Sequence, residues 1–299
     1  MSIDLEHRYS GKVRDLYTVD DAHMLMVASD RVSVFDVILP NLVPGKGRVL
    51  TALSTWWFAR TEHLVANHLV SSDPADFPAG AGPEAAGRSM LVRLTDPIRL
   101  ECVARGYLFG SAWSDYQATG SVQGHALPAG LCQAEQLPAP LFTPTTKAEG
   151  SHDLPLTDAE AAALIGDDLF EQVRDLTLMI YAFGAEHTQR NGIILADTKL
   201  EFGVLGGKDG LGDRVIVIDE MLTPDSSRYW PADEYRVGTS PPSFDKQFVR
   251  DHYQSIGWDK EPPVPEVPAD VIAGTRARYV EAYERITGLD FATWYGDDT

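Results

Sequence analysis

Alternating and continuous apolar runs predict strands in the first third of the chain. Short strands broken by turns are expected within residues 13–39, and further strands at 90–94 and 98–104, separated by Asp96-Pro97. Near-helical spacing of apolar residues predicts helices at 49–69, 168–190, 243–255 and 270–287. Both strands and helices are therefore expected in this chain.

Three segments lack such periodicity. Residues 71–88 are rich in Pro, Ala, Gly and Asp and resemble a surface insertion, whereas 262–268 forms a proline-rich spacer. Residues 126–155 contain many prolines and predict a long loop, which is often functional in a compact protein. The pattern Thr157 to Glu160 is a capping box, which predicts that a helix follows this loop. We find no internal repeat.

The most informative stretch predicts a charged β-hairpin around a turn at 206–210. Asp197, Lys199 and Glu201 would share one face of its first strand, because side chains alternate along a strand. Asp219 closes the apolar returning strand, so it could approach Glu201 beside a lysine, as phosphate-bound Mg²⁺ requires. A solvated hairpin is the weaker alternative, because solvated strands do not end an apolar run in acidic residues.

A second motif near the N-terminus contains the pair Gly11-Lys12 ahead of a strand. Glycine permits close backbone approach, and lysine neutralises phosphate oxygens. Alone, the pair is usually only a turn, and it is not a Walker A loop. The Gly11-Lys12 pair becomes informative together with the downstream hairpin, because the pair would hold phosphates and the hairpin would hold a metal.

Three further clusters carry candidate chemistry. The run 29–36 looks like a ligand-binding turn, although Asx and Ser turn chemistry explains it nearly as well. Arg105 and Ser111 flank a strand-to-helix transition, where free N–H groups and an arginine would hold an anion. A plain N-cap with a surface arginine is the alternative. In the run 143–153, His152 is more simply a surface histidine than a general base.

Composition limits the classes of function. The 299 residues suggest roughly two domains, and the net charge of −19 argues against nucleic acid or an anionic membrane as the main partner. Only Cys102 and Cys132 are present, so no disulfide framework is expected, which fits a reducing cytoplasm. No apolar run reaches the length of a membrane span, and the N-terminus lacks a signal-peptide pattern.

Several sequence blocks together resemble one enzyme family. In order they are SGKVRDLY, SDRVSVFD, GKGRVLTALSTWWF, ECVARGYLFGSAW, FTPTTKAEGSHD, DTKLEFG and DEMLTPDSSRYW. They cover nearly the whole chain and resemble the SAICAR synthetase family of purine biosynthesis, in its longer, fungal-type form. Two positions depart from the family pattern: Phe109 replaces a smaller or polar residue, and Val34 replaces a common alanine.

The resemblance implies an ATP-dependent ligase. Such an enzyme joins L-aspartate to the carboxylate of carboxyaminoimidazole ribotide (CAIR) and gives SAICAR, ADP and phosphate, with ATP and Mg²⁺ as cofactors. It also implies a fold of the α+β (mixed α/β) class with two lobes around an ATP cleft. One is a small, β-rich, kinase-like lobe at 1–95, and the other is a larger lobe at 96–299 that binds substrate and metal and carries the C-terminal helices. We expect a cytoplasmic protein, a monomer rather than a dimer.

The resemblance assigns roles to individual residues. Lys12, Lys199, Glu201 and Asp219 would be catalytic, and the two carboxylates would bind Mg²⁺. Gly11, Lys12, Arg14, Arg93 and Leu94 would bind the nucleotide together with Glu201 and Asp219. The substrates would contact Arg31, Ser33, Asp36, Arg105, Ser111, Lys147, Asp153, Asp197, Lys199, Asp225 and Arg228.

Two other functions fit part of the pattern. A kinase acting on a small phosphorylated metabolite or a lipid would share the glycine hairpin and the carboxylate hairpin. The chain, however, lacks an HRD-like catalytic loop and a basic surface run. A non-catalytic nucleotide sensor is the other alternative, and the intact Lys12, Lys199, Glu201 and Asp219 argue against it.

Overall fold

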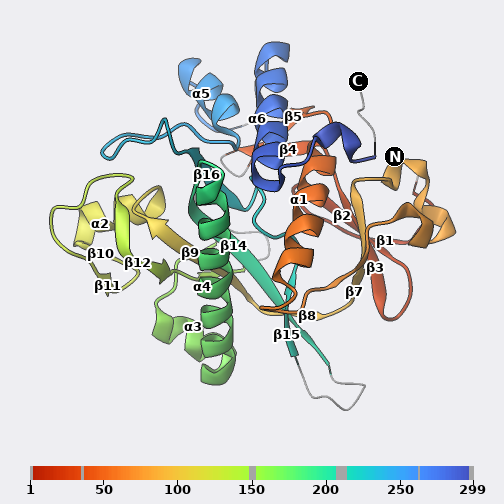
Figure 1. The fold of residues 1–299 in the computed structure, drawn as a ribbon, viewed down its shortest axis with the longest axis horizontal. Helices are drawn as coiled ribbons and strands as arrows, with labels where there is room; N and C mark the ends of the chain where they lie inside the picture. The colour runs from red at the N-terminus through yellow and green to blue at the C-terminus, as the bar shows by residue number, and fades with distance from the viewer. Residues whose placement is uncertain (1–2, 35–36, 148–152, 207–213, 262, 296–299) are drawn as a thin grey trace.

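The computed structural model describes residues 3–34, 37–147, 153–206, 214–261 and 263–295. It confirms the α+β class, because antiparallel sheets and packed helices occur together (Figure 1). The predicted turn at 206–210 lies, apart from Gly206, outside the described residues, as do Asp36 and His152.

The N-terminal sheet has five antiparallel strands in the order β1-β2-β3-β7-β6. Helix α1 packs against β3 and β7. It ends at Thr61 instead of near residue 69, because the following segment leaves the helix to pair with a distant strand: Val217 N donates to Ala66 O at 3.0 Å. The elements are β1 (His7–Ser10), β2 (Arg14–Thr18), β3 (His23–Ala28), β6 (Leu69–Ser71), β7 (Ser89–Arg93) and α1 (Lys46–Thr61).

The second sheet is built around one long strand, β14 (Ile193–Leu205). Its main order is β12-β9-β14-β15, with β13 on β9 and with β8 and β16 on β14. Helix α4 crosses β14, β9 and β12 and covers this face. The partners are β8 (Asp96–Pro97), β9 (Leu100–Tyr107), β12 (Gln136–Phe142), β13 (Thr145–Thr146), β15 (Arg214–Ile218), β16 (Ser227–Pro231) and α4 (Asp167–Arg190).

The prediction of a long loop at 126–155 is wrong at Thr145–Thr146, which form β13, and at Gln136–Phe142, which form β12. This strand contains Pro138 and Pro140, which cannot donate ladder hydrogen bonds, and it therefore lies at the sheet edge with an irregular register. The capping box is confirmed, because the Thr157 side chain accepts from Glu160 N at the start of α3 (Asp158–Ile165). Helix α2 (Ser111–Thr119) begins at Ser111 as expected, and β10 (Ser121–Val122) and β11 (His125–Ala126) form a small hairpin beyond it.

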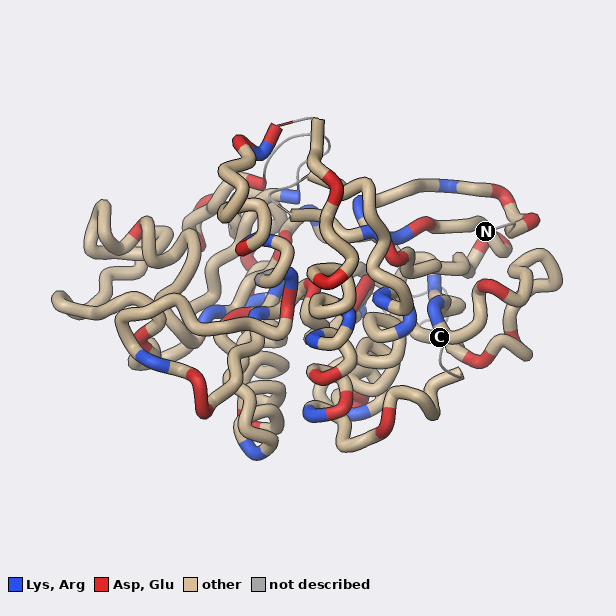
Figure 2. Tube along the Cα trace, turned by 90° about the horizontal axis from the view of Figure 1, so that it is seen from above, with Lys and Arg blue, Asp and Glu red and all other residues tan. Residues whose placement is uncertain are grey.

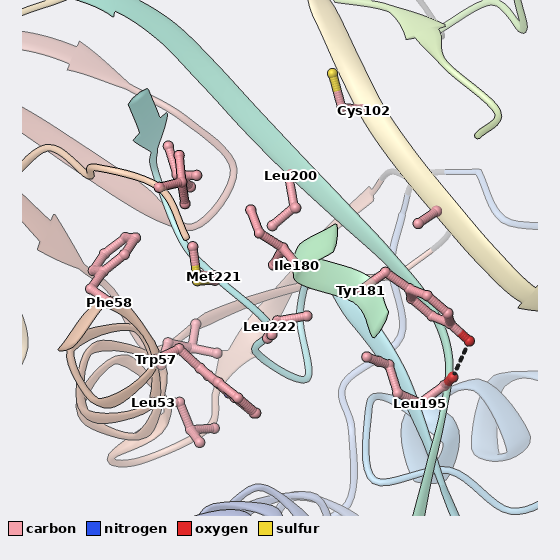
Figure 3. Packing of buried hydrophobic residues seen from close by; sticks show 14 of the residues in the cluster. Leu53, Trp57, Phe58, Cys102, Ile180, Tyr181, Leu195, Leu200, Met221 and Leu222 are labelled. Carbon is pink, nitrogen blue, oxygen red and sulfur yellow. Dashed lines mark hydrogen bonds between the residues drawn. The ribbon is translucent and has the colours of Figure 1, made fainter. Parts of the chain in front are cut away.

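The largest apolar cluster joins residues from both predicted lobes. Trp57 and Phe58 of α1 lie in the same cluster as Tyr181 of α4 and Leu200 of β14 (Figure 3). The Tyr181 hydroxyl donates to Leu195 O at 2.9 Å, so its polar end is satisfied inside the core. Cys102 is buried in this cluster, in keeping with a core role.

The C-terminal helices pack on N-terminal elements. Helix α6 (Ala269–Thr287) contacts α1, and α5 (Gln247–Ser255) contacts α6. A second apolar cluster includes Val34 of β4 (Arg31–Val34), Leu39 of β5 (Val37–Leu42) and Val249 of α5. The C-terminal helices therefore cover part of 1–95, and a lobe boundary near residue 95 stays a prediction. In the described part of the chain, no helix combines the length and apolar character needed to span a membrane.

Gly47 marks the tightest approach between α1 and β3. A Cβ atom there would lie 2.3 Å from Ala28 O, a backbone atom that cannot move aside cheaply. We expect Gly47→Ala to lower the free energy of unfolding by about 2–3 kcal/mol in urea denaturation. Gly206→Ala is the matched control, because its Cβ would meet nothing within 4 Å. Equal stability of the two variants would contradict this packing.

Candidate active site

The central strand β14 presents a row of charged residues beside β9. Asp197 pairs with Arg105, and Lys199 pairs with Val103. The Lys199 ammonium lies 2.5 Å from the Glu101 carboxylate and 3.3 Å from Glu201. The predicted neighbourhood of Lys199 and Glu201 is therefore confirmed, and β9 adds a second carboxylate to it.

Glu201 is held between two lysines. Lys147 comes from the segment after β13 and forms an ion pair with the Glu201 carboxylate, opposite Lys199. Burial disfavours the charge on Glu201, but the two lysines outweigh burial and lower its pKa to about 2. Glu201 therefore carries a negative charge at neutral pH. The long 126–155 segment brings a cation to the hairpin carboxylate.

Asp219 follows β15 directly, in a left-handed backbone conformation with φ of 64°. Its carboxylate lies 3.0 Å from Arg14 Nη1, and the other guanidinium nitrogen lies 2.6 Å from Glu220. Burial raises the pKa of Asp219 to about 6; Arg14 opposes this shift, and the negative charges of Glu201 and Glu220 add to it. Asp219 and Glu201 are thus close enough to repel each other.

This carboxylate pair suits a metal that is shared with phosphate oxygens. Among the described residues, no group of three or more His, Cys, Asp or Glu is arranged to hold a metal by itself. Mg²⁺ on a nucleotide usually takes only one or two carboxylates, together with phosphates and water. Burial raises the pKa of Asp219, and repulsion from Glu201 adds to this shift. A divalent cation would relieve that repulsion, so Glu201 and Asp219 fit Mg²⁺.

A second cluster joins Arg105, Ser111, Asp197 and Arg228. The Arg228 guanidinium pairs with Asp197 Oδ2 at 2.5 Å, and Arg105 Nη1 lies 3.5 Å from the same oxygen. Arg105 Nη2 donates to Ser111 Oγ at 3.3 Å, at the first residue of α2. A cavity of about 70 Å³ opens beside Arg105 and Ser111. Two arginines share one carboxylate here, so the cluster favours an added anion.

Phe109 and Gly110 shape this arginine cluster. The Arg228 guanidinium lies 4.8 Å from the centre of the Phe109 ring, a cation–π arrangement. Gly110 has a φ of 62°, and a Cβ there would lie 3.4 Å from Arg228 Nη1. The unusual Phe109 therefore supports Arg228 directly, and a glycine leaves room for it.

Arg31 holds the Gly11-Lys12 loop in place. Its guanidinium donates to both oxygens of Asp15, at 2.9 and 3.0 Å. It also donates to Lys12 O and Gly11 O, each at 3.2 Å. The Lys12 side chain is exposed. Arg31 therefore fixes the backbone from which the Lys12 side chain extends.

The segment expected to meet adenine already uses its amide groups. Arg93 N donates to His68 O at 2.8 Å, and Leu94 N donates to Ala22 O at 2.7 Å. His68 N in turn donates to Val217 O at 3.1 Å. This segment thus connects the N-terminal sheet to the strand that carries Asp219. An adenine contact here stays a prediction, and it would have to use groups other than these two amides.

The remaining predicted residues in the described part of the chain are Ser33, Asp153 and Asp225. Ser33 lies on β4, half-buried, and Asp153 is exposed. Asp225 is buried with a side chain only 3% exposed, where Lys46 and Lys246 contact its carboxylate. A larger open pocket of about 410 Å³ lies between residues 240–243, α5 and α6, and contains none of the predicted site residues.

Sequence reasoning did not select Glu101, Glu220, Lys46 or Lys246. A signal existed for Glu101, because period-two alternation along 101–105 places it on the same strand face as Arg105. No such local signal pointed to Lys46. Its partner Asp225 lies 179 positions away in the chain, so only the fold brings them together.

Comparison with known proteins is consistent across the chain. A profile of the SAICAR synthetase family matches residues 7–265. The chain is 53% identical over 290 residues to a phosphoribosylaminoimidazole-succinocarboxamide synthase of Saccharopolyspora erythraea, with 95% of each covered. It is 51% identical over 295 residues to a protein of the same name from Stenotrophomonas maltophilia, with 94% of each covered.

Solved structures agree with the sequence matches. The fold is similar to SAICAR synthase of Saccharomyces cerevisiae complexed with SAICAR, with a TM-score of 0.87, 41% identity and 96% of each chain covered. It is also similar to a type-2 SAICAR synthetase in complex with ADP, with a TM-score of 0.68, 26% identity, and 95% and 99% of the two chains covered.

The contacts of Arg31 allow a test of whether the Gly11-Lys12 loop binds nucleotide phosphates, as predicted. A lysine cannot reproduce the paired bonds to Asp15 and also reach two backbone carbonyls. We expect Arg31→Lys to weaken ADP binding about tenfold in titration calorimetry. Arg190→Lys is the control, because Arg190 forms an exposed pair with Glu186 on α4. Unchanged ADP affinity in Arg31→Lys would show that the loop does not need this arginine.

Proposed function

The chain belongs to the SAICAR synthetase family, and we propose that the charged residues of β9, β14 and β15 carry out this family's reaction. The protein is an ATP-dependent ligase of purine biosynthesis that joins L-aspartate to the carboxylate of CAIR and releases SAICAR, ADP and phosphate. One observation supports the assignment of residues above all. A single strand, β14, carries Asp197 of the arginine cluster and Glu201 of the carboxylate pair, roughly 13 Å apart along the strand.

The two ends of this row suit the two ends of the ribotide. Arg105, Ser111 and Arg228 would bind its phosphate, because this cluster holds more positive than negative charge and lies at the start of α2. Lys199 lies on β14, two positions after Asp197 and four positions before Gly203. It would lie beside the reacting carboxylate. The neighbour complexed with SAICAR supports a site for this class of ligand.

The other end of the row suits the nucleotide. Lys12 and Gly11 would approach its phosphates, and Arg14 links this loop to Asp219. Glu201 and Asp219 would hold Mg²⁺, which when bound neutralises phosphate charge and polarises the transferred group. Lys147 would lie beside the same phosphates, since it already contacts Glu201. The neighbour complexed with ADP supports nucleotide binding.

The chemistry requires the carboxylate to become a better electrophile. Its oxygen attacks the γ-phosphorus of ATP, the bond to the bridging oxygen breaks, and ADP leaves with an acyl phosphate formed. The aspartate amine then attacks the acyl carbon, loses a proton, and expels phosphate. Lys199 and Lys147 would stabilise the charge that gathers between two anionic reactants. Arg31, Ser33 and Asp36 are assigned to the CAIR and aspartate region as a prediction, and Asp153 is assigned to substrate binding in the same way. A cytoplasmic location and a monomeric state are also predictions.

Isotope transfer tests the reaction directly. Purified protein with ATP, Mg²⁺, L-aspartate and CAIR labelled with ¹⁸O in its carboxylate should release phosphate that carries one label, in step with SAICAR. The labelled oxygen leaves with the phosphoryl group, because it was the attacking atom. Unlabelled phosphate alongside SAICAR would exclude phosphoryl activation. Steady ADP release and a stable phosphorylated product without aspartate would make the protein a kinase.

The arginine cluster gives a second test. Arg228→Ala removes a charge-assisted contact worth about 1.5–3 kcal/mol, so we expect the KM for CAIR to rise by one to two orders of magnitude, roughly. ADP affinity should stay unchanged, because Arg228 belongs to the ribotide end. Arg236→Ala is a matched control, since Arg236 is an exposed arginine whose guanidinium donates to the neighbouring carbonyl oxygens of Asp233 and Tyr235. Equal loss of ADP affinity would place Arg228 in the nucleotide site.

A further inference from the structure

One turn carries residues of both ends of the site. It runs from Asp219 to Arg228 and is held by its own bonds: Thr223 Oγ1 donates to the Glu220 carboxylate, and Ser227 N donates to Thr223 O at 2.8 Å. Its Met221 and Leu222 side chains point into the core near Trp57 (Figure 3). The position of this turn therefore sets both Asp219 and Arg228.

Asp225 anchors the middle of the turn to three other segments. Lys46 Nζ, at the start of α1, lies 2.5 Å from one carboxylate oxygen. The other oxygen accepts from the Tyr279 hydroxyl of α6 at 2.6 Å and lies 3.3 Å from Lys246, just before α5. Lys46 and Tyr279 are fully buried. The Asp225 carboxylate thus points into the protein and is occupied by protein groups.

The charges around this turn are paired in two sets of ion pairs, one on Arg14 and one on Asp225. Three cations, Arg14, Lys46 and Lys246, contact three carboxylates, Asp219, Glu220 and Asp225. Charged residues of both signs interleave through the middle of the molecule (Figure 2). Burial disfavours the charge on Asp225, but Lys246 and Lys46 outweigh burial and keep its pKa well below the ordinary range. Such sets of ion pairs are stable only when every member keeps its partner.

We propose that Asp225 is a positioning residue, which acts through the turn without touching substrate, and that Lys46, Lys246 and Tyr279 hold the turn so that Asp219 and Arg228 face their ligands. Helix α6, remote from the charged strand β14, thereby takes part in the reaction through Tyr279. The inference rests on the proposed function for its kinetic test, and a binding test with inorganic phosphate is independent of that function.

The test compares two buried tyrosines that each lose one hydroxyl. Tyr279→Phe removes the bond to Asp225, whereas Tyr253→Phe on α5 removes a bond of 2.8 Å to Pro265 O, away from the turn. We expect both to lower the melting temperature by a similar amount. Only Tyr279→Phe should lower kcat/KM for CAIR, about tenfold, and weaken protection by inorganic phosphate in thermal-shift titrations.

A second pair of variants covers the case in which Tyr279→Phe does not fold. Lys246→Arg keeps the charge beside Asp225 and should retain activity and phosphate binding, whereas Lys246→Met should lose both in part. Lower melting temperatures with unchanged kcat, KM and phosphate binding would overturn the proposal, because Asp225 and its partners would then only stabilise the fold. Absence of SAICAR formation by the unaltered protein would instead overturn the proposed function, and the phosphate titrations would still decide the role of Asp225.

Discussion

The pairing of half-buried charges along and around β14 is the constraint on which the site depends. A carboxylate or ammonium removed from water is stable only beside an opposite charge. Glu201 therefore lies between Lys147 and Lys199, and Asp197 lies between Arg105 and Arg228. Lys199 lies on β14 itself, whereas Lys147, Arg105 and Arg228 come from other parts of the chain, so the fold brings these functional groups together around the strand.

Local periodicity was enough to predict part of this arrangement. The alternation of side chains along a strand predicted that Lys199 lies beside Glu201. The capping box at Thr157 could be predicted because its hydrogen bonds join residues three positions apart. Similarly, the start of α2 at Ser111 followed from the glycine before it. These features share one property: the interacting residues are neighbours in the chain, so their spacing alone fixes whether they can meet.

Features that depend on contacts between distant parts of the chain could not be predicted from the sequence. Helix α1 has apolar residues beyond Thr61, yet it ends there because the 66–68 segment pairs with Val217. The prolines of β12 resemble a loop until the strand is known to lie at an edge, where missing donors cost little. The family resemblance implies that Asp225 binds substrate, and its burial against Lys46 and Tyr279 appears only in three dimensions. The roles that the family resemblance assigns to Lys12, Asp36 and Asp153 form a third category. These roles are contacts with ligands, so contacts within the chain do not test them.

The bond from Tyr279 to Asp225 also bears on how the protein is made. Tyr279 lies 54 positions after Asp225 in the chain, so the turn that bears Asp219 and Arg228 lacks one of its anchors until α6 has been synthesised. The N-terminal sheet needs only residues before 94 and can form earlier, as N-terminal units generally do during synthesis. A chain that ends before α6 would contain the Gly11-Lys12 loop and the residues of β14 but would lack the bond that holds the turn.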